Sequence, residues 1–216
     1  MTLTMSELTA AEKQDLLLSA VAPRPIALAS TMGRDGKINL SPFSFFNVFS
    51  SEPPILIFSP AFRIRDGSRK HTLMNIEEVP EVAISIVDAS ILIRVNIASA
   101  EYPDGVNEFE YAGFTEMPST RIRPPFVKES KISMECKVIE IKPMGRKGGA
   151  GNLIICEVMV MHVDESILEE DQKICPIKFE QIARLGGDWY CRMDEAVLFT
   201  LGKPQGLPEK WKPNKS

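Results

Sequence analysis

The amino-acid sequence predicts a mainly β fold, an antiparallel β-barrel with a few short helices. Two features carry this prediction: short apolar runs typical of strands recur along the chain, and glycine or proline residues separate many of them. The 216 residues are 44% hydrophobic and 25% charged, which is the composition of a globular protein. A chain of this length can bury a core without a disulfide or a zinc ion.

The first expected element is an N-terminal helix over residues 6–22. Thr9 and Glu12 have the spacing of a capping box at its start. Pro23 and Pro25 then end the helix, because proline cannot continue its hydrogen bonds.

The first strands follow directly. Residues 26–31 and 38–40 flank an Asp-Gly pair, which predicts a hairpin. Residues 53–59 have a continuous apolar middle, as expected for a strand buried on both faces. Apolar residues alternate over positions 82–86, which predicts another strand.

The second half of the chain continues the pattern. Residues 132–141 alternate between apolar and polar types, and we expect them to pair with a long strand at 153–163 through the glycine-rich loop 144–151. Short helical segments are expected near Thr72 and over residues 106–111.

The expected organisation is an N-terminal helix (1–22), one barrel domain (23–200) and a Pro/Lys-rich, extended tail (201–216). The formal net charge of −4 argues against binding to nucleic acid or to an anionic membrane, which require a basic surface. The chain has no apolar run of bilayer length and no start resembling a signal peptide, so a cytoplasmic protein is expected.

Cysteines and histidines show no metal-binding spacing. The chain has no C-x-x-C pair, and its two histidines stand alone, so buried reduced thiols are favoured over a metal or redox site. His162 lies in an apolar run and is expected to be a strand residue with a satisfied polar tip. A Cys–His nucleophile pair has no local signature but stays open. The residues concerned are Cys136, Cys156, Cys175, Cys191, His71 and His162.

Three segments carry residues suited to chemistry. Residues 39–47 combine hydroxyls, amides and phenylalanines, which suit an aromatic heterocycle or, alternatively, a core strand that leads into a turn. Residues 63–72 offer cations and hydroxyls beside a helix start, which suits a phosphate or, alternatively, a solvated loop in which Thr72 is the N-cap. Residues 183–190 combine paired glycines with aromatic residues, which suits close approach to a ligand or a turn before a final strand.

The order of these segments resembles the flavin reductase-like family. The resemblance covers residues 23–190 and includes the stretch 24–31, residues 39–47 and 53–59, the phosphate-loop-like stretch 66–76, residues 102–115 and the Arg-Leu-Gly-Gly stretch at 184–187. His71 is a departure, since relatives often carry an acid at this place.

The resemblance implies a split antiparallel β-barrel that binds FMN as a homodimer, with the flavin at or near the subunit interface. It implies that Ser30 and Thr31 line the ring, with Ser44, Phe45 and Asn47 along its polar edge. It implies further that the ribityl chain and phosphate contact Ser59, Arg65, Ser68, Lys70 and Thr72, while residues 107–110 and Arg184 lie near the ring.

The leading functional hypothesis is therefore an FMN-dependent oxidoreductase with NAD(P)H as its electron donor. The sequence has no G-x-G-x-x-G fingerprint, so a nicotinamide would stack transiently on the flavin. Two alternatives stay open: an FMN-binding electron carrier or sensor without NAD(P)H turnover, and a barrel that binds no flavin. The acceptor is a small molecule or a protein that the sequence does not identify.

Overall fold

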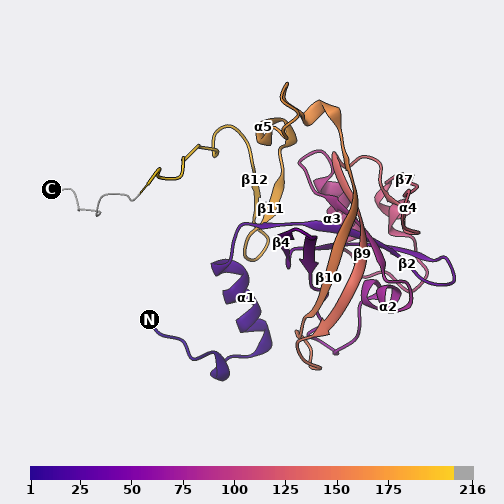
Figure 1. The fold of residues 1–216 in the computed structure, drawn as a ribbon. Coiled ribbons are helices and arrows are strands. Elements are labelled where there is room, and N and C mark those ends of the chain that lie inside the picture. Colours follow the sequence, from indigo (N-terminus) through magenta and orange to yellow (C-terminus); the bar gives the residue numbers. More distant parts are fainter. Residues whose placement is uncertain (207–216) are drawn as a thin grey trace.

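The computed structural model describes residues 1–206 and has a mainly β architecture built from antiparallel strand pairs, which confirms the predicted fold class (Figure 1). Its helices are η1 (Met5–Glu7), α1 (Ala10–Ala20), α2 (His71–Glu78), α3 (Leu92–Ala98), α4 (Glu108–Ala112), η2 (Glu165–Ile167) and α5 (Pro176–Phe179). Its strands are β1 (Arg24–Pro25), β2 (Ala27–Met32), β3 (Ile38–Phe43), β4 (Phe46–Ser51), β5 (Pro54–Phe58), β6 (Glu81–Ile86), β7 (Glu116–Met117), β8 (Phe126–Val127), β9 (Ile132–Pro143), β10 (Asn152–Val163), β11 (Ile182–Arg184) and β12 (Tyr190–Arg192).

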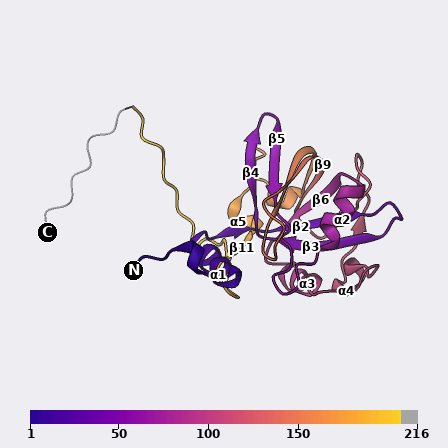
Figure 2. The same ribbon diagram turned by 90° about the horizontal axis from the view of Figure 1, so that it is seen from below.

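The main sheet has seven strands in the order β3-β2-β6-β9-β10-β5-β4. The expected hairpins are confirmed: Met32 pairs with Ile38, and Asn152 pairs with Pro143 across the glycine-rich loop. A smaller sheet has the order β1-β11-β12, and β7 pairs with β8. The β4–β5 hairpin projects from the body of the molecule, while α3 and α4 lie together at the opposite side (Figure 2).

Strand β2 is buried on both faces because helices pack on each side of it. Ala27 and Ala29 belong to the main hydrophobic cluster, which also contains residues of α2. Leu28, between them, points into a second cluster with Val95 of α3 and Phe109 of α4. Because successive side chains of a strand point to opposite faces, β2 contributes residues to both hydrophobic clusters.

The polar positions of β9 do not all face solvent, in contrast to what an alternating strand suggests. Glu135 is fully buried, because the segment before β8 covers this face of the sheet. Its carboxylate accepts hydrogen bonds from the backbone N–H groups of Thr120 (2.8 Å) and Arg121 (2.6 Å). His162 Nε2 lies 2.8 Å from Glu135 Oε1, so the expectation of a strand histidine with a satisfied polar tip is confirmed.

The N-terminal helix is shorter than the sequence suggested. Thr9 is its N-cap: the side chain accepts from the Glu12 N–H (3.3 Å), and the Glu12 carboxylate accepts from the Thr9 N–H (2.8 Å). This capping box, predicted correctly, starts α1 at Ala10, and the residues before it form only the short turn η1.

Arg24 fixes α1 to the small sheet. Its buried guanidinium donates to the carbonyl oxygens of Leu18 and Val21 (2.6 Å) in and after α1, and to the carbonyl of Leu185 (2.8 Å) after β11. A side chain on Gly186 would collide with Ser19, so this glycine permits the close contact. Since α1 itself buries no residue, these contacts determine where the helix lies.

The remaining sequence expectations concern thiols and the chain end. Cys136, Cys156 and Cys175 are buried and free, as predicted, whereas Cys191 is partly exposed. Residues 201–206 form no helix or strand and are exposed; the rest of the expected tail lies outside the described residues. Within residues 1–206, no helix has the length and apolarity required to cross a membrane.

Candidate functional site

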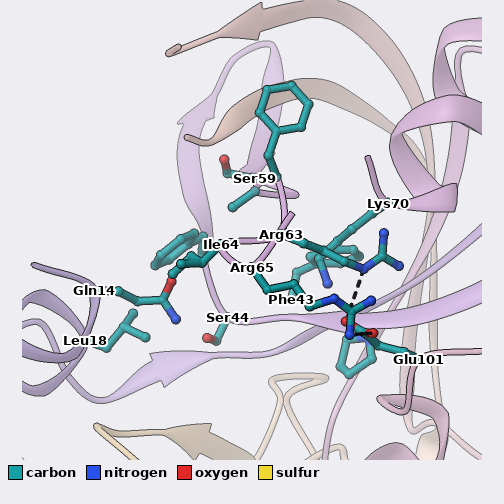
Figure 3. Close-up of a pocket in the computed structure, with 14 residues that line it drawn as sticks. Gln14, Leu18, Phe43, Ser44, Ser59, Arg63, Ile64, Arg65, Lys70 and Glu101 are labelled. Carbon is teal, nitrogen blue, oxygen red and sulfur yellow. Dashed lines mark hydrogen bonds and ion pairs between the residues drawn. The ribbon is translucent and has the colours of Figure 1, made fainter. Parts of the chain in front are cut away.

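A cavity of about 400 Å³ lies between α1, the β3–β4 junction, the segment after β5 and the N-terminus of α2 (Figure 3). Helix α1 contributes Gln14 and Leu18 to its wall, and Glu101 contributes from the segment after α3. Several of the residues that the sequence assigned to a cofactor also line it, namely Ser44, Phe45, Ser59, Arg65 and Lys70.

The apolar wall forms where β3 ends. Pro42 lies on β3, an edge strand of the main sheet, where proline is tolerated. The chain then turns at Ser44 and Phe45, and the N–H of Ser59 donates to the carbonyl of Phe45 (2.9 Å). Phe43 packs against Phe58 of β5, with 5.4 Å between the two ring centroids. The turn thereby presents an aromatic surface and backbone polar groups to one cavity.

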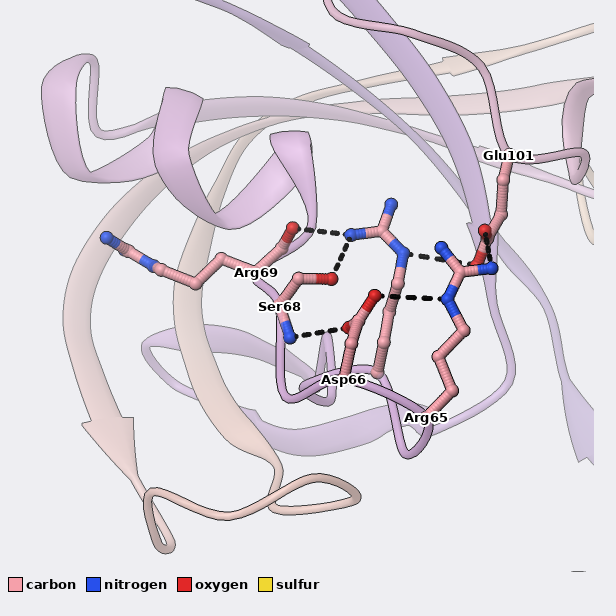
Figure 4. Close-up of polar contacts among 6 residues, drawn as sticks. Arg65, Asp66, Ser68, Arg69 and Glu101 are labelled. Carbon is pink, nitrogen blue, oxygen red and sulfur yellow. Dashed lines mark hydrogen bonds and ion pairs between the residues drawn. The ribbon is translucent and has the colours of Figure 1, made fainter.

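The opposite wall is cationic. Glu101 bridges two guanidinium groups: its Oε1 lies 3.1 Å from Arg63 Nε, and its Oε2 lies 2.8 Å from Arg65 Nη1. Arg63 Nη1 also donates to Ser68 Oγ (3.1 Å) and to the carbonyl of Arg69 (2.7 Å). Figure 4 shows Glu101 facing Arg65 within this network. This network holds both arginines in place beside the cavity.

The turn that follows the arginines is fixed by Asp66. Its carboxylate accepts from the N–H of Ser68 (2.8 Å) and from Arg65 Nε (3.0 Å). The hydrogen bonds from Ser68, together with those from Arg65, hold the pKa of Asp66 well below its usual range. Gly67 at the turn has a φ of +70°, which favours glycine.

Lys70 is the cation least compensated by the protein. Its ammonium lies 5.7 Å from the centroid of the Phe43 ring, and no carboxylate within the described residues pairs with it. Burial, and then the nearby charge of Arg63, lower the pKa of Lys70. The cavity wall therefore holds three cations, Arg63, Arg65 and Lys70, against the carboxylate of Glu101.

The N-terminus of α2 adds to this positive potential. Lys70 is the N-cap residue, and its side chain makes no capping hydrogen bond. The first N–H groups of a helix and its dipole both favour an anion. Together with the surplus of cations, this arrangement suits a phosphate group.

The glycine-rich loop supports the cavity from behind. Phe62, in the wall, donates from its N–H to the carbonyl of Ala150 (3.0 Å) and accepts from the N–H of Gly149 (2.9 Å). A Cβ on Gly148 would lie 2.9 Å from the carbonyl oxygen of Arg63, and one on Gly151 would lie 2.5 Å from Ser59 Oγ. Gly148 therefore lets the loop pack directly on the backbone of the segment that carries the cations, and Gly151 leaves room for the Ser59 hydroxyl.

Three of the predicted site residues are not among those that line the cavity, because they are buried in the protein. Thr72 is the second residue of α2, and its Oγ1 accepts from Asn39 Nδ2 (2.9 Å). The alternative in which Thr72 caps the helix is therefore wrong. Thr31 Oγ1 accepts from Asn75 Nδ2 (3.2 Å), and Ser30 Oγ is buried with no hydrogen-bond partner among the described residues.

Others occupy different surroundings. Ser68 supports Arg63 rather than lining the cavity itself. Asn47 lines a separate apolar cavity, and its Oδ1 accepts from the N–H that follows it (2.8 Å). Arg184 lines a second cavity that shares Ser44 with the first.

Residues 107–110 also lie away from the cavity within one chain. They start α4, and the buried carboxylate of Glu108 accepts from the N–H of Leu40 (2.9 Å). Burial raises the pKa of Glu108. In this chain the segment therefore braces β3.

Several residues that line the cavity are not among the site residues that the sequence predicts. Arg63 lies in the same basic segment as Arg65, and that signal could have found it. Glu101 directly precedes a stretch that carried the family resemblance, yet nothing in its spacing predicts that it bridges two arginines. For Gln14 and Leu18, no sequence signal places α1 over the cavity.

The fold and site together define a β-barrel protein whose cavity suits a planar aromatic ligand that carries an anionic group. The family model of the flavin reductase like domain matches residues 19–180, which is most of the chain. The protein therefore belongs to the flavin reductase-like family, and its membership supports flavin-related oxidoreduction.

Solved structures agree with this assignment. Nitrilotriacetate monooxygenase component B from Bacillus cereus is 31% identical with a TM-score of 0.86, over 93% of this chain and 98% of that one. The 2-nitrobenzoate 2-nitroreductase of Pseudomonas fluorescens is 30% identical with a TM-score of 0.83, over 97% of this chain and 99% of that one. A Shewanella frigidimarina protein described as having a split barrel domain has a TM-score of 0.76 at 24% identity, over 92% and 96%, so the fold is a split barrel.

Among curated proteins, an uncharacterised protein from Halalkalibacterium halodurans is 37% identical over 206 residues, which is 94% of this chain and 97% of that protein.

Proposed function

We propose that this protein is an FMN-dependent oxidoreductase that passes electrons from NAD(P)H through the bound flavin to an acceptor. The observation that carries the proposal is the cavity itself, which combines an aromatic wall at Phe43 and Phe45 with a surplus of cations at Arg63, Arg65 and Lys70. Family membership supplies the flavin, and the cationic end favours a flavin with a terminal phosphate.

The residues present fit FMN. Ser59, Arg63, Arg65 and Lys70 would hold the phosphate, and the desolvated ammonium of Lys70 gains most from an added anion. Glu101 keeps the guanidinium groups oriented before the ligand arrives, which lowers the entropic cost of binding.

The other end of the cavity fits the flavin ring. Backbone and hydroxyl groups at Ser44 would contact its polar edge, while Phe43 and Phe45 supply apolar surface and Leu18 of α1 excludes water from one side. FMN, when bound, supplies the hydride-accepting and electron-transferring chemistry. The protein's own task is then to orient the ring and to stabilise negative charge on it.

We further propose that the protein forms a homodimer. The projecting β4–β5 hairpin exposes Val48 and Phe49, with 64% and 63% of their surfaces accessible, and β10 exposes Met159 and Met161. Apolar side chains of this size are enriched at interfaces between subunits. Analytical ultracentrifugation of the full chain tests this: a monomer at micromolar concentration would contradict it.

An absorbance spectrum of the purified protein, recorded after incubation with FMN and gel filtration, tests the main proposal. We expect flavin bands that bleach when NADPH or NADH is added without oxygen. Bands that persist with both nucleotides would favour the electron carrier without NAD(P)H turnover. A protein that retains no flavin would contradict the FMN assignment itself.

A further inference from the structure

We propose that the second cavity, on the other side of the Pro42–Ser44 wall, binds an aromatic carboxylate. This cavity has a volume of about 330 Å³ and shares Pro42, Phe43 and Ser44 with the first one. A ligand there would lie next to the flavin ring, so this inference rests on the proposed function and identifies the class of small molecule that meets the flavin.

The walls of the second cavity favour a flat aromatic ring. Ile26, Phe43 and Val95, which are buried core residues, supply apolar surface to it. On another side Arg184 lies over the ring of Tyr190, with its guanidinium carbon 4.4 Å from the ring centroid. These two residues pair across β11 and β12, so the sheet fixes the stacked arrangement. Ligand pockets combine apolar walls with a few placed polar groups, and a guanidinium is attracted to an aromatic face, so these walls suit an aromatic ring with a polar substituent.

The charged side chains of this cavity suit a ligand carboxylate that takes the place of Asp188, because Arg184 is the one cation and Asp188 the one carboxylate among the residues that line it. Arg184 pairs with Arg24 across β1 and β11, and Arg24 is already hydrogen-bonded to backbone carbonyl groups. Burial, and then the charge of Arg184, lower the pKa of Arg24, so the two guanidinium groups are close enough to repel each other. A carboxylate can accept two parallel hydrogen bonds from a guanidinium, a match that a neutral amide lacks.

The protein's own compensation for Arg184 is weak. Arg184 donates to the carbonyl of Gly187 (2.5 Å) and lies 3.4 Å from Asp188 Oδ1. The Asp188 side chain is fully exposed, and an ion pair so exposed contributes little. A ligand carboxylate seated against the apolar walls can therefore displace Asp188, which acts as its competitor.

Calorimetric titration of the full chain, loaded with FMN, tests this inference with benzoate and with benzamide as a neutral probe of the same shape. We expect benzoate to bind about tenfold more tightly than benzamide. Arg184→Gln should abolish that preference while leaving benzamide binding unchanged. Asp188→Asn, which removes the competing carboxylate but keeps the size of this lining side chain, should instead tighten benzoate binding by about twofold to fivefold.

A matched control is Arg192→Gln. Arg192 lies on β12 close to Tyr190, pairs with Glu180 and does not line the cavity, so its loss should leave benzoate binding unchanged. If Arg184→Gln disturbs folding, the exposed variant Asp188→Asn still tests the inference, because it should tighten benzoate binding.

Equal binding of the two probes would overturn the inference. A preference for benzamide would also overturn it and would indicate a nicotinamide-like amide. Displacement of FMN by benzoate would also overturn it, because the second cavity would then belong to the flavin. The same titration without FMN separates the two proposals: benzoate binding that depends on Arg184 in a protein that cannot hold FMN would support the carboxylate site and contradict the proposed function.

Discussion

The molecule holds charged groups in two contrasting settings. At the Glu135 cluster, a fully buried carboxylate receives hydrogen bonds from the N–H groups of Thr120 and Arg121 and contacts His162. At the cavity beside α2, Lys70 and its neighbouring arginines face an open volume with Glu101 as the one carboxylate among the residues lining it. The first cluster is electrostatically complete, whereas the second has more cations than anions.

This difference separates structure from function. A charge taken out of water must be satisfied by the protein, or the fold loses several kcal/mol. Glu135 meets this demand, so its cluster stabilises the sheet and offers nothing to a ligand. Cations at the edge of a cavity keep partial contact with water until a ligand replaces that water. Those without a carboxylate partner in the protein can then form charge-assisted hydrogen bonds with an anionic ligand. Variants in each cluster test whether the two clusters divide these tasks.

The largest effect is expected for Glu135→Ala. The substitution leaves the N–H donors of Thr120 and Arg121, together with His162, without their buried acceptor, so the free energy of unfolding should fall by about 3–5 kcal/mol. Urea denaturation measures it. The control is Glu101→Gln at the cavity, whose parent side chain is 50% exposed, and it should change the unfolding free energy by less than about 1 kcal/mol.

The same contrast has a pH dependence. Burial alone would raise the pKa of Glu135, but the hydrogen bonds from Thr120, His162 and Arg121 lower it overall. A carboxylate with a lowered folded-state pKa adds stability above its ordinary pKa, and this contribution declines as the pH falls through the lowered value. The difference between wild type and Glu135→Ala should therefore shrink in acid; a constant difference would show that packing, not charge, dominates this cluster.

The second prediction compares Lys70→Ala with Thr72→Ala. Removing the ammonium should weaken FMN binding by about 1.5–3 kcal/mol, which is roughly tenfold to more than a hundredfold in Kd, with little loss of stability. Removing the Thr72 hydroxyl should instead cost about 1–3 kcal/mol of stability, because it leaves the buried Asn39 amide unpaired. Fluorescence titration with FMN and urea denaturation measure the two effects. If Thr72→Ala instead weakened FMN binding and Lys70→Ala did not, the division into a binding role for Lys70 and a structural role for Thr72 would be wrong.

Much of the fold could be predicted because its signals are local. The capping box at Thr9, the Asp-Gly hairpin and the pairing of 132–141 with 153–163 all depend on nearby residues. The buried state of Glu135 could not be predicted, since it depends on a covering segment that is distant in space until the sheet forms. Helix α3 was missed, and its surroundings explain why it is stable: Val95 packs in the second core beside Leu28.

The candidate site divides in the same way. Residues of one basic segment, such as Arg65 and Lys70, lie at the cavity as the sequence predicted, because they are close along the chain and precede a helix. Thr31 and Thr72 belong to the same matched motifs, yet their hydroxyls accept hydrogen bonds inside the protein. A motif identifies which residues belong together, but only the packing decides which of them face the ligand. Glu101 shows the converse, since its role arises from contacts alone.

The third prediction concerns the loop behind the cavity. In Gly151→Ala the new Cβ would lie 2.5 Å from Ser59 Oγ, so Ser59 must turn or move away from the phosphate end. We expect FMN binding to weaken by about 1 kcal/mol, or roughly fivefold in Kd. Gly202→Ala, where a Cβ meets nothing within 4 Å, is the matched control and should bind FMN as the wild type does. Equal affinities in both variants would place the phosphate away from Ser59.

The smallest expected effect is the pH dependence of FMN binding. Burial and the charge of Arg63 lower the pKa of Lys70, so its ammonium loses its proton at a lower pH than an ordinary lysine. The Kd for FMN should then rise as the pH increases into the alkaline range, whereas Lys70→Arg should stay flat because a guanidinium keeps its charge. Fluorescence titrations across that range, for both proteins, measure the difference. If both curves rise together, the loss must come from another group, and Lys70 would lose its place as the principal cation for the phosphate. If only the wild type rises, the uncompensated charge that distinguishes this cavity from the Glu135 cluster is the charge that binds the ligand.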